Sequence, residues 1–148
     1  MLQDRKLLFS DKQSAAWNTG DNASTDIIDL HGGLAKGAFG QALSRSSPSR
    51  SMRLLFGLIV NESLTSSGSA TVNIRLQDSA DGSTWSDLVT TGALSYSTLA
   101  AGYVINWYVP DSARRYLRVL YTVGTAATTG GKITAGLFMH PIGADTNV

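Results

Sequence analysis

The sequence predicts an all-β domain, a jelly-roll-like β-sandwich or barrel of six to eight strands with an extended N-terminal arm and a long irregular loop. Three observations indicate this fold. Along residues 114–123 and 132–140, every second residue is apolar and the residues between them are mixed in character, as in strands that bury one face. Turn residues separate several further segments of strand length. No segment has the apolar spacing of an amphipathic helix.

The length of 148 residues suits one domain, which we expect to span residues 1–148. Within it, residues 1–17 form the N-terminal arm, 31–52 the extended loop, 53–140 the main strands and 141–148 a polar tail. The arm carries an apolar triplet, Leu7-Leu8-Phe9, which must dock either on its own sheet or on a neighbouring subunit.

The first strands after the arm are expected on either side of the long loop. A turn cluster at 18–22 precedes a short strand at 24–30. Residues 52–60 are almost continuously apolar, which predicts a central strand covered on both faces. Residues 61–69 are polar and predict a loop.

The middle of the chain predicts a hairpin and one further strand. Residues 70–79 alternate cleanly, and an Asp-Gly turn at 80–83 leads to a returning strand at 85–89. Residues 90–98 are loop-like, with at most a short strand near Leu94, and residues 103–109 form an aromatic and β-branched strand.

The loop at 31–52 has two interpretations. It is rich in glycine and serine. Lys36, Arg45 and Arg50 lie within it and Arg53 directly follows it, and there is no acidic residue between Asp29 and Glu62. A loop of about twenty residues is often functional or ordered by a partner. A solvated surface loop explains the same composition, and the sequence leaves both interpretations open.

Composition argues against several classes of protein. Formal net charge is +1, with 12 Lys and Arg residues, so no basic field predicts a nucleic-acid partner. No apolar run reaches the ~18 residues of a membrane span, and the N-terminus lacks the apolar core of a signal peptide. There are no cysteines. We therefore expect a soluble protein, made in the cytoplasm, that binds neither membrane nor nucleic acid.

The residue types that catalysis requires are scarce. His31 and His140 show no metal-ligand spacing, and no serine lies in a G-x-S-x-G motif. Asp78, Asp81 and Asp87 gather around one predicted turn, where aspartate mainly satisfies backbone groups. We expect no enzyme activity, no cofactor and no metal.

Several strand and turn phrases are similar to those of a known family. Residues 7–13 and 24–30, the alternating strand at 70–77 with its Ser-x-Asp-Gly turn, and residues 114–123 with the strand that follows them resemble the cement, or decoration, proteins of tailed-phage capsids. The short-tailed Bordetella phage is one source of this family.

The resemblance implies a jelly-roll-like virion protein on the exterior of an icosahedral capsid, where it clamps adjacent major capsid subunits. The implied partners are the major capsid protein of the same phage and further copies of the chain, as a dimer or trimer. Arginine suits contacts with acidic patches of a capsid, and apolar arm residues suit docking. The contact residues expected on this basis are Leu7, Leu8, Phe9, Arg45, Arg50 and Arg53.

The alternative function is a carbohydrate-binding β-sandwich module, such as a virion lectin. It predicts Trp17, Trp85 or Trp107 exposed on one flat face, where sugar rings stack. The cement interpretation predicts the same tryptophans buried or at protein interfaces.

Overall fold

The computed structural model describes residues 7–30, 52–110 and 113–141. This part of the chain contains nine β-strands and no helix, which confirms the predicted all-β class. The strands are β1 (Leu8–Ser14), β2 (Gly20–Ala23), β3 (Ile28–Asp29), β4 (Met52–Ser66), β5 (Thr71–Ser79), β6 (Ser86–Ser95), β7 (Val104–Tyr108), β8 (Tyr116–Gly124) and β9 (Thr128–Pro141).

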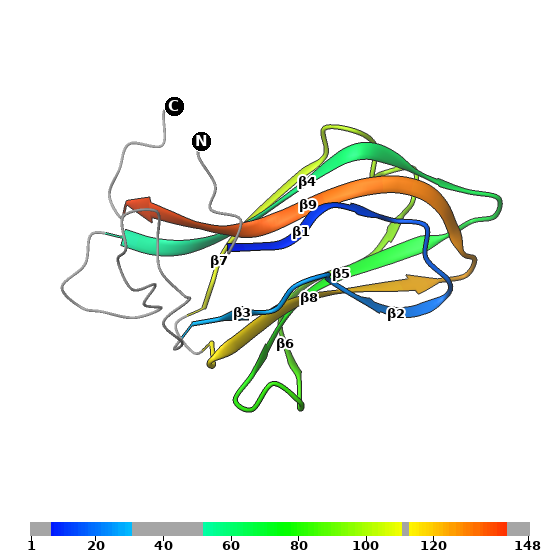
Figure 1. Cartoon of the computed structure of the whole chain (residues 1–148). Helices are drawn as coiled ribbons and strands as arrows, with labels where there is room; N and C mark the ends of the chain where they lie inside the picture. The colour runs from blue at the N-terminus through cyan, green and yellow to red at the C-terminus, as the bar shows by residue number, and fades with distance from the viewer. Residues whose placement is uncertain (1–6, 31–51, 111–112, 142–148) are drawn as a thin grey trace.

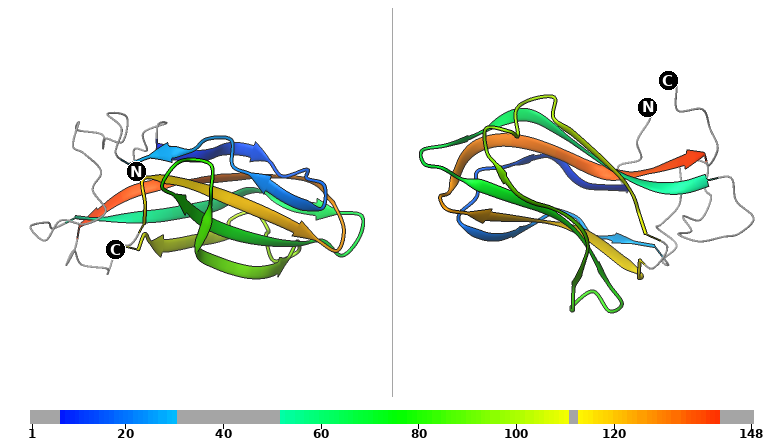
Figure 2. Two further views of the ribbon diagram at one scale, coloured as in Figure 1. Left: turned by 90° about the horizontal axis from the view of Figure 1, so that it is seen from below. Right: turned by 180° about the vertical axis from the view of Figure 1, so that it is seen from behind.

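The strands form two antiparallel sheets that face each other as a β-sandwich (Figures 1 and 2). The first sheet has the order β1-β9-β4-β7, and the second has the order β2-β8-β5-β6 with β3 also on β8. Strands β2 and β3 pair with successive parts of β8, so they act as one interrupted strand. Counted this way, each sheet has four strands and the chain passes between the sheets as in a jelly roll.

The core lies between the sheets and is built from one face of each strand. The alternation predicted for 114–123 and 132–140 is confirmed, because every second residue of β8 and of the matching part of β9 is buried. Aromatic rings pack in this core: Phe56 lies 6.0 Å from Phe9 and 5.3 Å from Trp107 within the first sheet, and Trp17 stacks on Tyr121 of the second sheet at 4.6 Å.

Two strands extend through segments that were expected to be loops. β4 continues to Ser66 through most of the polar stretch at 61–69, because β9 continues beside it across several bulges. Glu62 and Lys132 form an ion pair of 3.0 Å along this extension. β6 likewise runs to Ser95 through residues expected as loop, because it pairs with the whole length of β5.

The region before the long loop differs from expectation in the opposite way. The residues expected as a turn cluster at 18–22 largely belong to β2, and the strand expected over 24–30 is only β3. A serine explains the interruption. The Ser24 hydroxyl accepts a hydrogen bond from the Val119 amide at 3.1 Å and donates one to the Asp26 carbonyl at 2.9 Å. These side-chain hydrogen bonds replace regular backbone pairing with β8 in the segment that separates β2 from β3.

Candidate functional site

The outward side of the first sheet carries an apolar surface, which we call the outer apolar face. It is formed by Leu55 and Ile59 of β4, Val104 and Tyr108 of β7, and Phe138 of β9. Strand register brings them together, because Leu55 pairs with both Tyr108 and Phe138, and Ile59 pairs with Val104. Residues at the alternate positions of the same strands point into the core.

The exposure of this face is unusual for this chain. Ile59, Val104 and Tyr108 are 41%, 51% and 44% exposed. They are three of the four large hydrophobic residues that are exposed in the described part of the chain, and the fourth is Ile27. A grouped apolar patch of this kind marks an interaction surface more often than scattered apolar residues do.

The outer apolar face also corrects one sequence-based prediction. The apolar run at 52–60 predicted a strand covered on both faces, but the second sheet covers only one face of β4. None of the described strands lies over the other face (Figure 2). The sequence of β4 therefore has the character of a doubly covered strand, and its outer side is suited to a partner outside the described chain.

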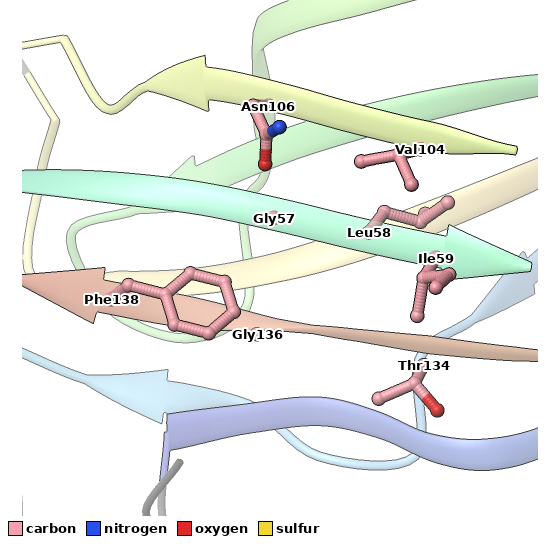
Figure 3. A pocket seen from close by; sticks show the side chains of 8 residues that line it. All are labelled: Gly57, Leu58, Ile59, Val104, Asn106, Thr134, Gly136 and Phe138. Atoms are coloured by element: carbon pink, nitrogen blue, oxygen red, sulfur yellow. The ribbon is translucent and has the colours of Figure 1, made fainter. Parts of the chain in front are cut away.

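A shallow hollow lies in the middle of this face (Figure 3). Gly57 of β4 and Gly136 of β9 are paired in register and form its floor, because neither has a side chain to fill the space. The hollow has a volume of about 140 Å³ and is lined by Gly57, Leu58, Ile59, Val104, Asn106, Thr134, Gly136 and Phe138. A cavity of about 150 Å³ is large enough for one benzene ring. The hollow can thus receive one apolar side chain of a partner.

Gly57 sets the position of the neighbouring aromatic ring. A Cβ atom at Gly57 would collide with the ring of Phe138, which lies over the glycine (Figure 3). The glycine therefore allows Phe138 to form one wall of the hollow. Its backbone has no positive φ angle, so its role here is the space it leaves.

The hollow contains no titratable side chain. Its polar residues are Asn106 and Thr134, and the Thr134 hydroxyl donates to Asn61 Oδ1 at 2.6 Å and accepts from the Lys12 amide at 3.1 Å. These contacts hold Thr134 in place at the edge. The arrangement can bind an apolar group, and it offers no nucleophile or general base.

The arm residues expected at contacts have different positions in the structure. Leu7 and Phe9 are buried in the core of their own chain, and Phe9 packs against Phe56. Residues 8–14 therefore belong to the sandwich as β1, so the apolar triplet docks on its own sheet, which is one of the two positions that the sequence left open. Leu8 is half-buried and pairs with Gly136, next to the hollow.

Of the three arginines predicted at contacts, only Arg53 lies within the described residues. Arg45 and Arg50, like most of the loop at 31–52, lie outside the described residues. Arg53 lies in β4, in register with His140. Their contact with an acidic partner stays a prediction.

The tryptophans do not form a shared platform. Trp17 stacks on Tyr121 in the core, and Trp107 stacks on Phe56. Trp85 lies at the second sheet, where the Arg118 guanidinium covers its ring at 4.3 Å. The lectin alternative predicted at least one of these tryptophans exposed on a flat face, but Trp17 is buried and Trp85 and Trp107 are half-buried.

Of the aspartates near the β5–β6 connection, Asp81 satisfies amides of the turn as predicted, whereas Asp78 and Asp87 bind arginine and glutamine side chains. Burial raises the pKa of Asp78, but hydrogen bonds and charge from Arg114 outweigh this effect and lower the pKa overall. Arg114 contacts both carboxylate oxygens, at 3.0 and 3.1 Å. Hydrogen bonds from the Thr84 and Ser83 amides and from the Ser79 hydroxyl lower the pKa of Asp81 to about 2.

Two further kinds of feature are absent from the described ranges. No group of three histidine, aspartate or glutamate side chains there is placed to hold a metal ion. The same ranges contain no helix that is long and apolar enough to cross a membrane.

The residues that form the hollow were not predicted from the sequence. Gly57, Val104, Gly136 and Phe138 come from three strands, and only the strand order β9-β4-β7 brings them together. The continuous apolar run at 52–60 was the available signal, because it placed apolar residues on both sides of one strand.

Comparison with known proteins gives one family. Residues 9–137 match the family model described as Bbp16, a range that includes the whole of β2 to β8. A comparison with curated proteins gives no match.

Proposed function

Because the chain belongs to the Bbp16 family, which is phage-associated, we propose that it is a capsid cement or decoration protein. In this role it binds the outside of an icosahedral phage shell and clamps adjacent major capsid subunits. The observation that carries the proposal is the outer apolar face with its hollow, which supports a stable contact with another protein.

The physical properties of the fold suit this role. The docking residues lie on three hydrogen-bonded strands of one sheet, so their relative positions are fixed before binding. A preorganised surface loses little conformational entropy on contact. Each contact can be modest in energy, since many identical copies on a symmetric shell act together.

The proposed partners follow from the same role. They are the major capsid protein of the same phage and other copies of this chain, as a dimer or trimer, on the capsid exterior. Arg45, Arg50 and Arg53 add a basic region that would meet acidic patches of the shell. The role requires no catalytic group and no cofactor.

The test is co-sedimentation of the purified protein with expanded shells of the same phage that lack it. The expected result is saturable binding at a fixed number of copies per major capsid subunit, together with a higher melting temperature of the shell. Absence of saturable binding to these shells would contradict the proposal. A salt series separates the apolar part of the contact from the basic part, because only the latter is screened.

A further inference from the structure

A second feature lies on the outward side of the second sheet, on the opposite side of the sandwich from the outer apolar face. Arg118 of β8 lies between Trp85 and Gln77 of β5, with its guanidinium carbon 4.3 Å from the centre of the Trp85 ring. Its Nε donates a hydrogen bond to Gln77 Oε1 at 2.9 Å. Gln77 Nε2 donates in turn to Asp87 Oδ1 at 2.7 Å, which fixes the amide with its oxygen toward Arg118.

Arg118 differs from the other arginines whose side chains are described. Arg75 pairs with Asp21 and Asp87, Arg114 with Asp78, and Arg115 with Asp29, all within 3.3 Å. Arg118 has no carboxylate partner among the described residues, and its two terminal nitrogens make none of the hydrogen bonds found there. Its charge is thus available to a group from outside.

The surroundings of Arg118 strengthen the attraction between its guanidinium group and a counter-ion. Burial lowers the pKa of Arg118, the charge of Asp21 opposes this effect, and the charge of Arg75 adds to it. A partly desolvated guanidinium interacts more strongly with a counter-ion than one that is fully hydrated.

The turn before Trp85 is held by its own hydrogen bonds. Asp81 Oδ1 accepts from the Ser83 amide at 2.8 Å and from the Thr84 amide at 2.9 Å, and Ser79 Oγ accepts from the Gly82 amide at 2.8 Å. The stacked pair of Trp85 and Arg118 therefore exists before any partner arrives. Trp and Arg are also the residue types most enriched among the energetically dominant positions of protein interfaces.

We propose that Arg118, oriented by Gln77 and Trp85, binds one carboxylate of an acidic side chain presented by a partner protein. The terminal nitrogens offer the parallel N–H groups that fit the two oxygens of a carboxylate. The identity of the partner as a capsid subunit rests on the proposed function, whereas the carboxylate site does not.

The first test observes the arginine side chains directly. Sodium acetate is titrated into the ¹⁵N-labelled full chain at constant ionic strength, with sodium chloride as the reference, and the arginine Nε–H signals are followed by NMR. The signal of Arg118 should shift saturably with acetate. That of Arg115, which already holds Asp29, should shift several-fold less. Equal shifts of the two signals, or an Arg118 shift that chloride reproduces, would overturn the proposal.

A phosphate arm distinguishes the ligand chemistry. Inorganic phosphate at matched ionic strength should bind Arg118 more tightly than acetate only by the amount that the additional negative charge of phosphate predicts. Binding at least tenfold tighter than that of acetate would overturn the assignment to a carboxylate in favour of a phosphate group.

The second test uses the shells. Arg118→Lys keeps the charge but removes the planar fork, and Arg115→Lys is the matched control on the same strand region. Arg118→Lys should weaken shell binding about tenfold with an unchanged unfolding midpoint, and Arg115→Lys should leave it unchanged. Equal binding of both variants would remove Arg118 from shell docking. If the wild-type chain does not bind shells while acetate still shifts Arg118, the proposed function fails and the carboxylate site stands.

Discussion

Replacing Ile59 and Val104 together by threonine tests the outer apolar face directly. The two residues are paired across β4 and β7, and both line the hollow. Threonine keeps the β-branched shape and strand preference of both residues, so the sheet should persist. The change replaces apolar surface by a hydroxyl group at the place where a capsid subunit is proposed to dock.

The expected magnitude follows from the exposed fractions. Complete burial of an aliphatic side chain contributes about 1.5–3 kcal/mol. Ile59 is 41% exposed and Val104 is 51% exposed, so about half of this contribution remains for a partner to realise. Each substitution should thus cost about 1 kcal/mol of binding and the pair about 2 kcal/mol, which corresponds to roughly 30-fold weaker binding per copy.

The assay is co-sedimentation with shells that lack the protein, measured over a concentration series. The matched control is Ile27→Thr, since Ile27 is 52% exposed but lies between β2 and β3, next to the second sheet. Urea unfolding of each variant checks that the folds are equally populated, because each substitution also removes some apolar surface from the folded chain.

The control should bind shells as the wild-type chain does. If the double variant also binds with wild-type affinity while both remain folded, the outer apolar face is not the docking surface. Equal weakening by the control would show that binding responds to any loss of surface hydrophobicity.

Three further predictions concern other parts of the chain. Asp78→Ala should lower the free energy of unfolding at pH 7 by about 2 kcal/mol, because it removes the buried partner of Arg114. Since the folded-state pKa of Asp78 is lowered, its contribution is present above the ordinary value of 3.8 and is lost as pH falls below it. In urea unfolding between pH 7 and pH 2.5, the free energies of unfolding of the wild-type chain and of Asp78→Ala should therefore converge as the pH falls. A difference that stays constant over this range would contradict the prediction. Gly57→Ala should displace the Phe138 ring and weaken shell binding with little loss of stability; unchanged ring signals in NMR spectra would refute the steric argument. Arg45→Ala with Arg50→Ala should weaken shell binding at low salt and have little effect at high salt, and a salt-independent effect would remove these cations from the contact.

The strands that could be predicted are those whose residues carry their own evidence. Leu117, Val119, Tyr121 and Val123 stand at every second position and form a continuous apolar set, and this local pattern was sufficient to place β8 and its buried face. The far part of β4 could not be predicted in this way. Its polar residues are held in a strand by pairing with β9, about seventy residues further along the chain, and pairing partners leave no mark on local composition.

The outer apolar face was predictable only in part. The apolar run at 52–60 indicated that both sides of β4 seek cover, but not that one side would lack it within the described chain. The hollow depends on Gly57 and Gly136 being in register, and a shift of one residue would place side chains there instead. The sequence likewise could not show that Arg118 has no carboxylate partner among the described residues. Which arginines lie close to an aspartate depends on the three-dimensional arrangement of the strands.

The position of β9 has a consequence for the synthesis of the protein. β9 lies between β1 and β4, although it is the last strand to leave the ribosome among those described here. Until β9 is made, no strand connects β1 to β4 in the first sheet. Gly136 and Phe138 are also missing from the hollow. Long-range pairing of this kind forms late in folding. A nascent or truncated chain therefore lacks the proposed docking surface, and only chains completed through β9 have all three strands that form the hollow.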